Sequence, residues 1–160
     1  TACAEQRQGA HPPDCPMHAA HGTGPGSLTP EEVAGYLAGR GMGLARPAEL
    51  NHHPGPRHVL DLAKELSLTD RQASATQAIY ERMLASALPL GAKYVEAEQR
   101  LAAAFERGGV EGPALSALVQ EVARLRGELR FVHLAAHAEL RPVLTSDQVA
   151  RYDALRGQVR

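Results

Sequence analysis

The sequence LTDRQ at residues 68–72 and the sequence LTSDQ at residues 144–148 decide the fold expected for this chain. Each places a threonine three residues before a glutamine, which is the spacing of a helix capping box. In that box the threonine hydroxyl accepts a hydrogen bond from the glutamine amide, and the glutamine side chain reaches back to the threonine amide. The two motifs predict two helix starts, and a looser copy, LTPEE at residues 28–32, predicts a third.

Apolar residues at helical spacing surround these starts. The pattern predicts a helix of about three turns over residues 56–67, a long helix over residues 70–106 and a second long helix over about residues 113–142. A last helix follows the second motif. Because Pro89 lies inside the first long helix and proline removes a backbone hydrogen bond, we expect a kink near residues 86–88.

Composition favours an all-α fold. The 160 residues suffice for one domain, aromatic residues make up only 4%, and the residues that favour strands are sparse. Each long helix has one apolar stripe, so neither is stable in isolation. We expect a curved, long antiparallel helical hairpin with short flanking helices, and we expect two chains to pair as a homodimer that covers the remaining apolar surface.

The charge balance and the missing motifs exclude several classes of function. Lys and Arg number 17 against 18 Asp and Glu, a net charge of -1, which gives no electrostatic footprint for nucleic acid. No apolar run approaches the ~20 residues of a transmembrane segment. The sequence has no nucleophile elbow, phosphate-binding glycine loop or HExxH motif. We therefore expect no nucleic-acid partner, no transmembrane segment and no enzymatic activity.

Residues 1–55 differ in composition from the rest of the chain. They contain both cysteines and clusters of glycine and proline at residues 11–13, 22–26 and 54–56. Such clusters favour irregular structure. We expect residues 1–55 to form a flexible arm rich in His, Cys, Gly and Pro with one short helix, and residues 56–160 to form the helical-hairpin domain.

The two Leu-Thr-x-x-Gln motifs around a long helical hairpin resemble the periplasmic LTxxQ-motif family typified by Spy, CpxP and ZraP, and are most similar to its CnrX-like heavy-metal sensor branch. The resemblance covers residues 56–157 and includes the Arg-Tyr-Asp sequence at residues 151–153. It implies a periplasmic location, a curved helical dimer, and a role as a heavy-metal sensor or resistance accessory. The alternative role is an ATP-independent chaperone or envelope-stress adaptor. The implied partners are an inner-membrane regulator or unfolded envelope proteins.

The histidines of the second long helix form the first candidate metal site. His133 and His137 are four residues apart, so both imidazoles can reach one ion from one helix face. The family resemblance implies that His58 and a carboxylate, Glu81, also bind, and that Glu65 could replace a missing histidine. The expected cofactor is a divalent transition metal: Zn, Ni, Co or Cu. The alternative is a solvated or partly buried histidine pair without a metal.

The arm contains the second candidate site. Cys15, Met17 and His18 offer a thiolate, a thioether and an imidazole, which suit a soft or borderline ion such as Cu(I) or Zn(II). The alternative is a histidine-containing linker. A disulfide between Cys3 and Cys15 is compatible with the oxidising periplasm and would remove Cys15 from metal binding. Alternatively, residues 1–3 resemble the end of a lipoprotein signal, which would make Cys3 a lipid anchor.

Overall fold

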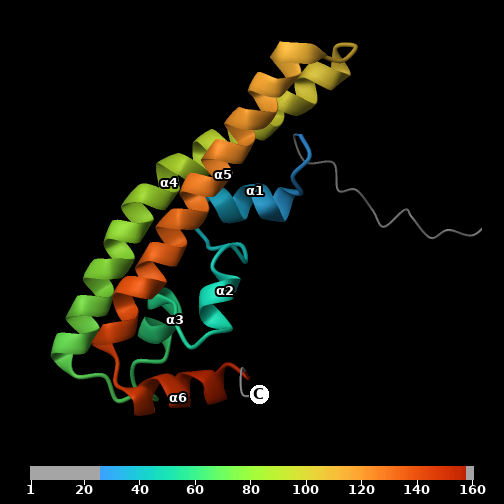
Figure 1. Cartoon of the computed structure of the whole chain (residues 1–160). Coiled ribbons are helices and arrows are strands. Elements are labelled where there is room, and N and C mark those ends of the chain that lie inside the picture. The colour runs from blue at the N-terminus through green and yellow to red at the C-terminus, as the bar shows by residue number, and fades with distance from the viewer. Residues whose placement is uncertain (1–25, 158–160) are drawn as a thin grey trace, which may run out of the picture.

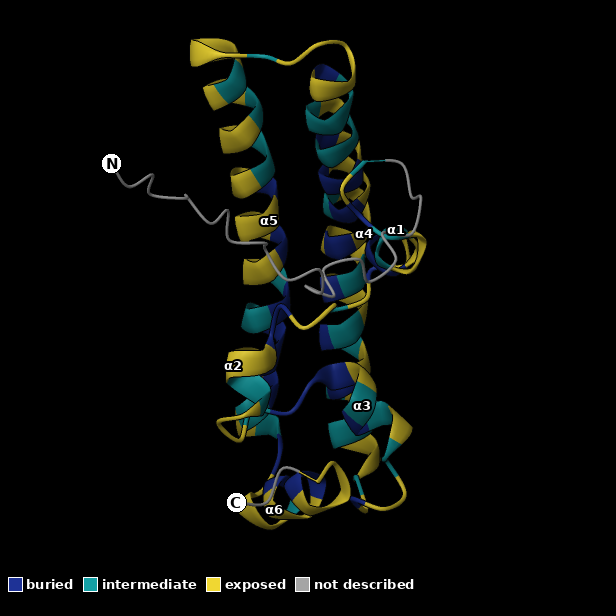
Figure 2. Cartoon of the chain, turned by 90° about the vertical axis from the view of Figure 1, so that its right-hand side faces the viewer, coloured by how far each residue is buried: buried dark blue, intermediate teal, exposed yellow. Residues whose placement is uncertain are grey.

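The structure, a computed structural model, describes residues 26–157, and within that range the chain is helical and has no strand. This confirms the predicted all-α class. Two long helices, α4 (Asp70–Glu106) and α5 (Gly112–Leu140), lie side by side and run in opposite directions (Figures 1 and 2). No helix in the described range is long and apolar enough to cross a bilayer.

Three helices begin at the predicted capping boxes: α1 (Pro30–Leu37), α4 and α6 (Ser146–Leu155). In each box the threonine hydroxyl accepts from the backbone N–H three residues later at 3.1–3.2 Å, and the side chain at that position accepts from the threonine N–H. The pairs are Thr29 with Glu32, Thr69 with Gln72 and Thr145 with Gln148. The predicted helix starts are therefore confirmed.

The two glutamines of the repeated motif meet each other at the end of the hairpin where α4 begins and α5 ends. Gln72 Nε2 donates to Gln148 Oε1 at 2.8 Å, and Gln148 Nε2 donates to Gln72 Oε1 at 3.0 Å. Each amide also donates to a backbone carbonyl, Gln72 to Val143 at 3.0 Å and Gln148 to Leu66 at 3.2 Å. The sequence predicts the two helix starts but not this contact between them.

Helix α1 crosses α4 at a glycine. A Cβ atom at Gly91 would overlap the carbonyl oxygen of Tyr36, so this approach of α1 to α4 requires glycine. Beside the crossing, the rings of Tyr36 and Tyr94 pack edge to face with centroids 4.9 Å apart and an interplanar angle of 74°. These two tyrosines belong to a buried apolar cluster that also includes Leu125 and Leu129 of α5, each only 1% exposed.

A second buried cluster lies at the other end of the hairpin, where α3 (Pro56–Asp61) and α6 pack against α4 and α5. Val59, Leu140 and Tyr152 are fully buried there. Helix α3 is shorter than the three turns that the sequence predicts, because the chain continues in turns to Ser67, where φ is +51°. A short 3-10 helix, η1 (Arg141–Val143), leads from α5 to the second motif.

Residues 26–55 differ from the flexible arm that composition predicts. Helix α1 and a second short helix, α2 (Arg46–Glu49), lie beside the hairpin (Figure 1). Leu28, Tyr36 and Leu44 are buried in the same cluster as residues of α4 and α5. The sequence predicts only one helix here, because four residues are too few for a periodic signal. Residues 1–25 lie outside the described residues.

Helix α4 has the predicted bounds and contains Pro89 within one continuous helix. Pro89 lies on the exposed side of α4. The carbonyl group four residues earlier, which proline deprives of a hydrogen bond, is at the exposed Ala85. Water can therefore satisfy that carbonyl, and the helix tolerates proline at this position.

Candidate metal centre

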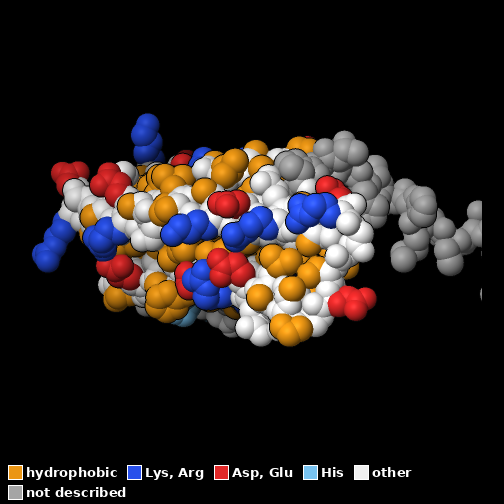
Figure 3. Space-filling model, turned by 90° about the horizontal axis from the view of Figure 1, so that it is seen from above, with side chains coloured by type: hydrophobic (Ala, Val, Ile, Leu, Met, Phe, Trp, Pro, Cys, Tyr) orange, Lys and Arg blue, Asp and Glu red, His pale blue; other side chains and the backbone are white. Residues whose placement is uncertain are grey.

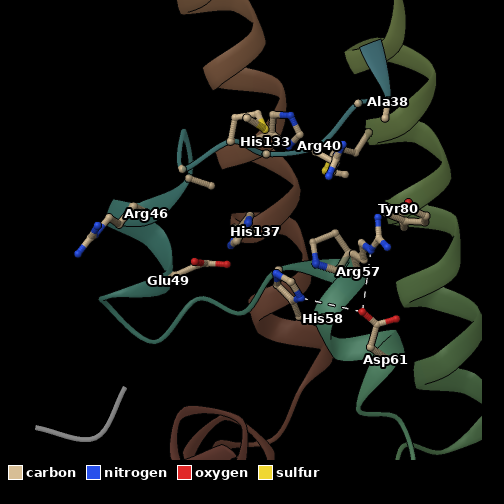
Figure 4. A pocket seen from close by; sticks show the side chains of 18 residues that line it. Ala38, Arg40, Arg46, Glu49, Arg57, His58, Asp61, Tyr80, His133 and His137 are labelled. Carbon is tan, nitrogen blue, oxygen red and sulfur yellow. Dashed lines mark ion pairs between the residues drawn. The ribbon is translucent and has the colours of Figure 1, made fainter. Parts of the chain in front are cut away.

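A pocket of about 440 Å³ lies between α2, α3, α4 and α5 and is closed on one side by the segment that joins α1 to α2 (Figure 4). His58 from α3 and both His133 and His137 from α5 line it. The structure therefore brings three of the residues that the sequence analysis singles out to one cavity. His58 is separated from the pair by 75 or more positions in sequence, so only the packing of α3 against α5 unites them.

His137 is held by the backbone of the segment before α3. Its Nδ1 lies 2.8 Å from the carbonyl oxygen of His53. Because a carbonyl only accepts, Nδ1 must carry the proton, and in the neutral ring the lone pair is then on Nε2. A backbone carbonyl that fixes the tautomer in this way is the usual outer partner of a metal-binding histidine. Gly55 lies against the ring, where a Cβ atom would come 3.0 Å from Nε2.

His133 is 3% exposed, and its Nε2 is buried with no hydrogen-bond partner among the described residues. Burial lowers the pKa of this imidazole, and the proximity of His137 lowers it further. The ring is thus held in its neutral form, which is the form that binds metal ions. A buried imidazole nitrogen without a partner is uncommon, because buried polar groups are nearly always hydrogen-bonded.

The third imidazole and the nearest carboxylate come from short helices. Burial lowers the pKa of His58, with a smaller contribution from Arg156, while Glu49 and Asp61 oppose the shift. Glu49 lines the pocket from α2, and its Oε1 lies 3.7 Å from the Cβ position of Gly55 that His137 Nε2 also approaches. Figure 4 shows the side chains of Glu49, His58 and His137 directed toward a common space.

The structure does not bring Glu81 to the pocket. Glu81 is exposed on α4, and its Oε1 accepts a hydrogen bond from Gln77 Nε2 at 2.8 Å. The residues of α4 that line the pocket are Tyr80 and Met83. Glu81 points away because one residue turns an α-helix by about 100°. The exposed Glu65 does not line the pocket either, so Glu49, which the sequence analysis missed, is the carboxylate nearest to the histidines.

Within residues 26–157 no three His, Cys, Asp or Glu side chains form a group that could hold a metal ion. Binding of an ion would therefore require the half-buried His58 and Glu49 to move toward the α5 pair. Arg40, Arg46 and Arg57 also line the pocket, and Arg57 Nε lies 3.9 Å from Asp61 Oδ2. These guanidinium groups oppose a cation, so its binding depends on neutral imidazoles and on the charge of Glu49.

Met42 and Met83 also line the pocket. Sulfur donors of this kind favour soft and borderline ions over Mg²⁺ or Ca²⁺, which require oxygen donors. Imidazoles and thioethers fit a transition-metal ion, whereas the three arginines of the same lining oppose any cation.

Cys15, Met17 and His18 lie outside the described residues, as does Cys3. The second metal site, the disulfide and the lipid anchor therefore stay predictions. No family model, curated protein or solved structure matches the chain. The family resemblance thus rests on the motif residues alone.

Proposed function

We propose that this chain is a non-enzymatic, periplasmic metal-binding protein that acts as a heavy-metal sensor or resistance accessory. The proposed ligands are His133 and His137 from α5, joined by His58 and by Glu49 in place of Glu81. Zn(II), Ni(II), Co(II) and Cu(II) are the candidate ions, because imidazole suits all of them.

The observation that supports this proposal most is the hydrogen bond from His137 Nδ1 to the His53 carbonyl. It leaves the lone pair on Nε2 available to a metal ion, in a ring whose orientation is already fixed. His133 lines the same cavity, and its buried Nε2 has no hydrogen-bond partner among the described residues; an ion that reached this nitrogen would satisfy a polar group that is costly to bury alone.

Thermal unfolding of the full chain, with and without each ion, tests the proposal. An ion that binds only the folded state adds about 2.7 kcal/mol of stability at a hundredfold excess over the dissociation constant. Glu49→Gln should reduce the shift in Tm, and Glu81→Gln should leave it unchanged as the matched control. His133→Ala combined with His137→Ala should abolish it, with circular dichroism to check that the helices persist.

Three outcomes decide the proposal. If no ion raises the Tm of the parent protein, the metal function is wrong. If the shift survives in the double histidine variant and disappears in the variant Cys15→Ser, Met17→Ala, His18→Ala, the site is in the arm. If Glu49→Gln and Glu81→Gln reduce the shift equally, a nonspecific charge effect explains it.

The alternative function, an ATP-independent chaperone or envelope-stress adaptor, is favoured by exposed apolar side chains beside basic ones. Figure 3 shows hydrophobic patches next to a row of Lys and Arg side chains on one face. Acidic residues pair with several of these cations, however: Arg82 with Glu139, and Arg124 with both Glu121 and Glu128. Suppression of aggregation of an unfolded client at near-stoichiometric amounts, without any response to metal, would favour the chaperone.

A further inference from the structure

The pocket between α2, α3, α4 and α5 is much larger than a bare metal ion. Its volume is about 440 Å³. A cavity of about 15 Å³ is enough for one water molecule, which is larger than a transition-metal ion. Pockets of about 300–1,000 Å³ are typical of sites for small organic ligands. The pocket therefore has room for an organic molecule that binds together with an ion.

Groups that bind a cation lie on the side of the pocket formed by α2, α3 and α5. His137 Nδ1 is bonded to the His53 carbonyl oxygen at 2.8 Å, so the lone pair on Nε2 is available. Figure 4 shows His58 and Glu49 close to this ring. Within residues 26–157, however, no three such side chains form a group that could hold an ion by themselves. An ion in this pocket would thus keep coordination positions that another ligand must fill.

Groups that bind an anion lie on the side of the pocket toward α4. Figure 4 shows Arg40 and Arg57 there, near Tyr80, whereas Arg46 extends away from them. Arg40 has no ion pair within the part of the chain that the structure describes. Arg57 has only a long contact of 3.9 Å with Asp61, and both of these side chains are more than half exposed. Both guanidinium groups are therefore accessible to a carboxylate, whose two oxygens match their planar fork.

The charges of the lining favour a metal complex over a bare ion. Three arginines against two carboxylates leave the lining with one net positive charge when its imidazoles are neutral. A bare divalent ion adds two positive charges, and repulsion is stronger at a partly closed site than in water. The complex of the same ion with a tricarboxylate carries one negative charge instead. Such a complex would neutralise the pocket.

We infer that the ligand of this pocket is a divalent metal ion in complex with a small polycarboxylate anion. The proposed histidines and Glu49 bind the metal, and the polycarboxylate fills the coordination positions that they leave. Arg40 and Arg57 bind the carboxylate oxygens that face α4. The inference rests on the proposed metal-binding function and specifies its ligand.

Citrate distinguishes the complex from the bare ion, because it lowers the concentration of free metal. The Tm of the full chain is measured with Ni(II) alone, with citrate alone and with both at a 1:1 ratio. If the protein binds the complex, citrate at constant total Ni(II) increases the shift in Tm. If it binds only the bare ion, citrate decreases that shift. Ethylenediamine, a neutral chelator, is the matched control and should not increase the shift.

Arginine variants locate the anion. Arg40→Gln combined with Arg57→Gln should weaken binding of the complex of Ni(II) with citrate by about tenfold or more, because hydrogen bonds between charged groups are the strong ones. The response to Ni(II) alone should remain. Arg71→Gln is the matched control, since Arg71 is an exposed arginine of α4 outside the pocket, and it should change neither response. Equal losses in the control and in the double variant would overturn the inference.

Equilibrium dialysis with radiolabelled citrate separates the inference from the proposed function. Retention of one citrate per chain with Ni(II), and of none without it, supports the inference. A shift in Tm with Ni(II) that citrate decreases overturns the inference and leaves the proposed function intact. Retention of citrate without Ni(II) indicates a site for the anion alone and also overturns the inference. No response to Ni(II), with or without citrate, overturns both.

Discussion

Replacing Gln72 with alanine tests whether the two LTxxQ motifs stabilise the fold as one unit. The side chain makes four hydrogen bonds of 3.0 Å or less: it accepts from Thr69 N–H and Gln148 Nε2, and it donates to Gln148 Oε1 and the Val143 carbonyl. A hydrogen bond contributes about 1 kcal/mol net, and water can replace part of these bonds at this half-buried site. We expect the free energy of unfolding in urea to fall by about 2–3 kcal/mol.

The third capping box supplies the control. Glu32→Ala removes the same back-bond to a threonine amide, but Glu32 makes no bond to another motif, so we expect a loss of only about 1 kcal/mol. Gln148→Ala should cost as much as Gln72→Ala. The double variant should cost about 1–2 kcal/mol less than the sum, because the two side chains share two bonds. Additive effects, or equal losses for Gln72→Ala and Glu32→Ala, would refute the reasoning.

Three further outcomes follow from the packing. Gly91→Ala should lower stability by about 1–3 kcal/mol, since the new Cβ overlaps the Tyr36 carbonyl, and a thermal midpoint equal to that of the parent would contradict the described crossing. Burial lowers the pKa of His133 in the folded state, so the unfolded chain, whose histidine has a pKa of about 6.5, binds more protons and the free energy of unfolding falls as the pH falls through that value. His133→Leu should therefore flatten the dependence of the urea midpoint on pH near and below about pH 6.5. An unchanged slope would show that His133 is not the group responsible. His52→Ala should cost about 1 kcal/mol in thermal unfolding by removing the 2.6 Å bond to the buried Asp153, whereas a neutral effect would show that solvent replaces it.

The fold was predictable where the signal is local. Thr69 and Thr145 begin helices because a capping box involves only four consecutive residues, and the bounds of α4 follow from the cap at one end and Gly108 at the other. The meeting of Gln72 and Gln148 was not predictable, because it depends on the length of both long helices and on the turn between them. The same holds for α2, which contacts α5, far away in the sequence.

The candidate site divides in the same way. His133 and His137 were predictable from their spacing on one helix, and His58 from the family resemblance. Glu49 was not, because a glutamate on a four-residue helix has no periodic pattern and reaches the pocket only through the packing of residues 26–55. Glu81 was predicted as a ligand from its position in the sequence, but it does not line the pocket. Its angular position on α4 directs the side chain to solvent.

The bond between Gln72 and Gln148 also has a consequence for kinetics. It joins residues 76 positions apart, and the entropic cost of closing such a loop falls once α4 and α5 have paired from the turn at residues 107–111. We therefore expect the glutamine pair to form after the folding transition state. Its removal should then speed unfolding and leave the folding rate almost unchanged, with a φ-value near zero. In a chain of this design the repeated motif determines how long the folded state persists, while the turn at the far end determines how quickly it forms.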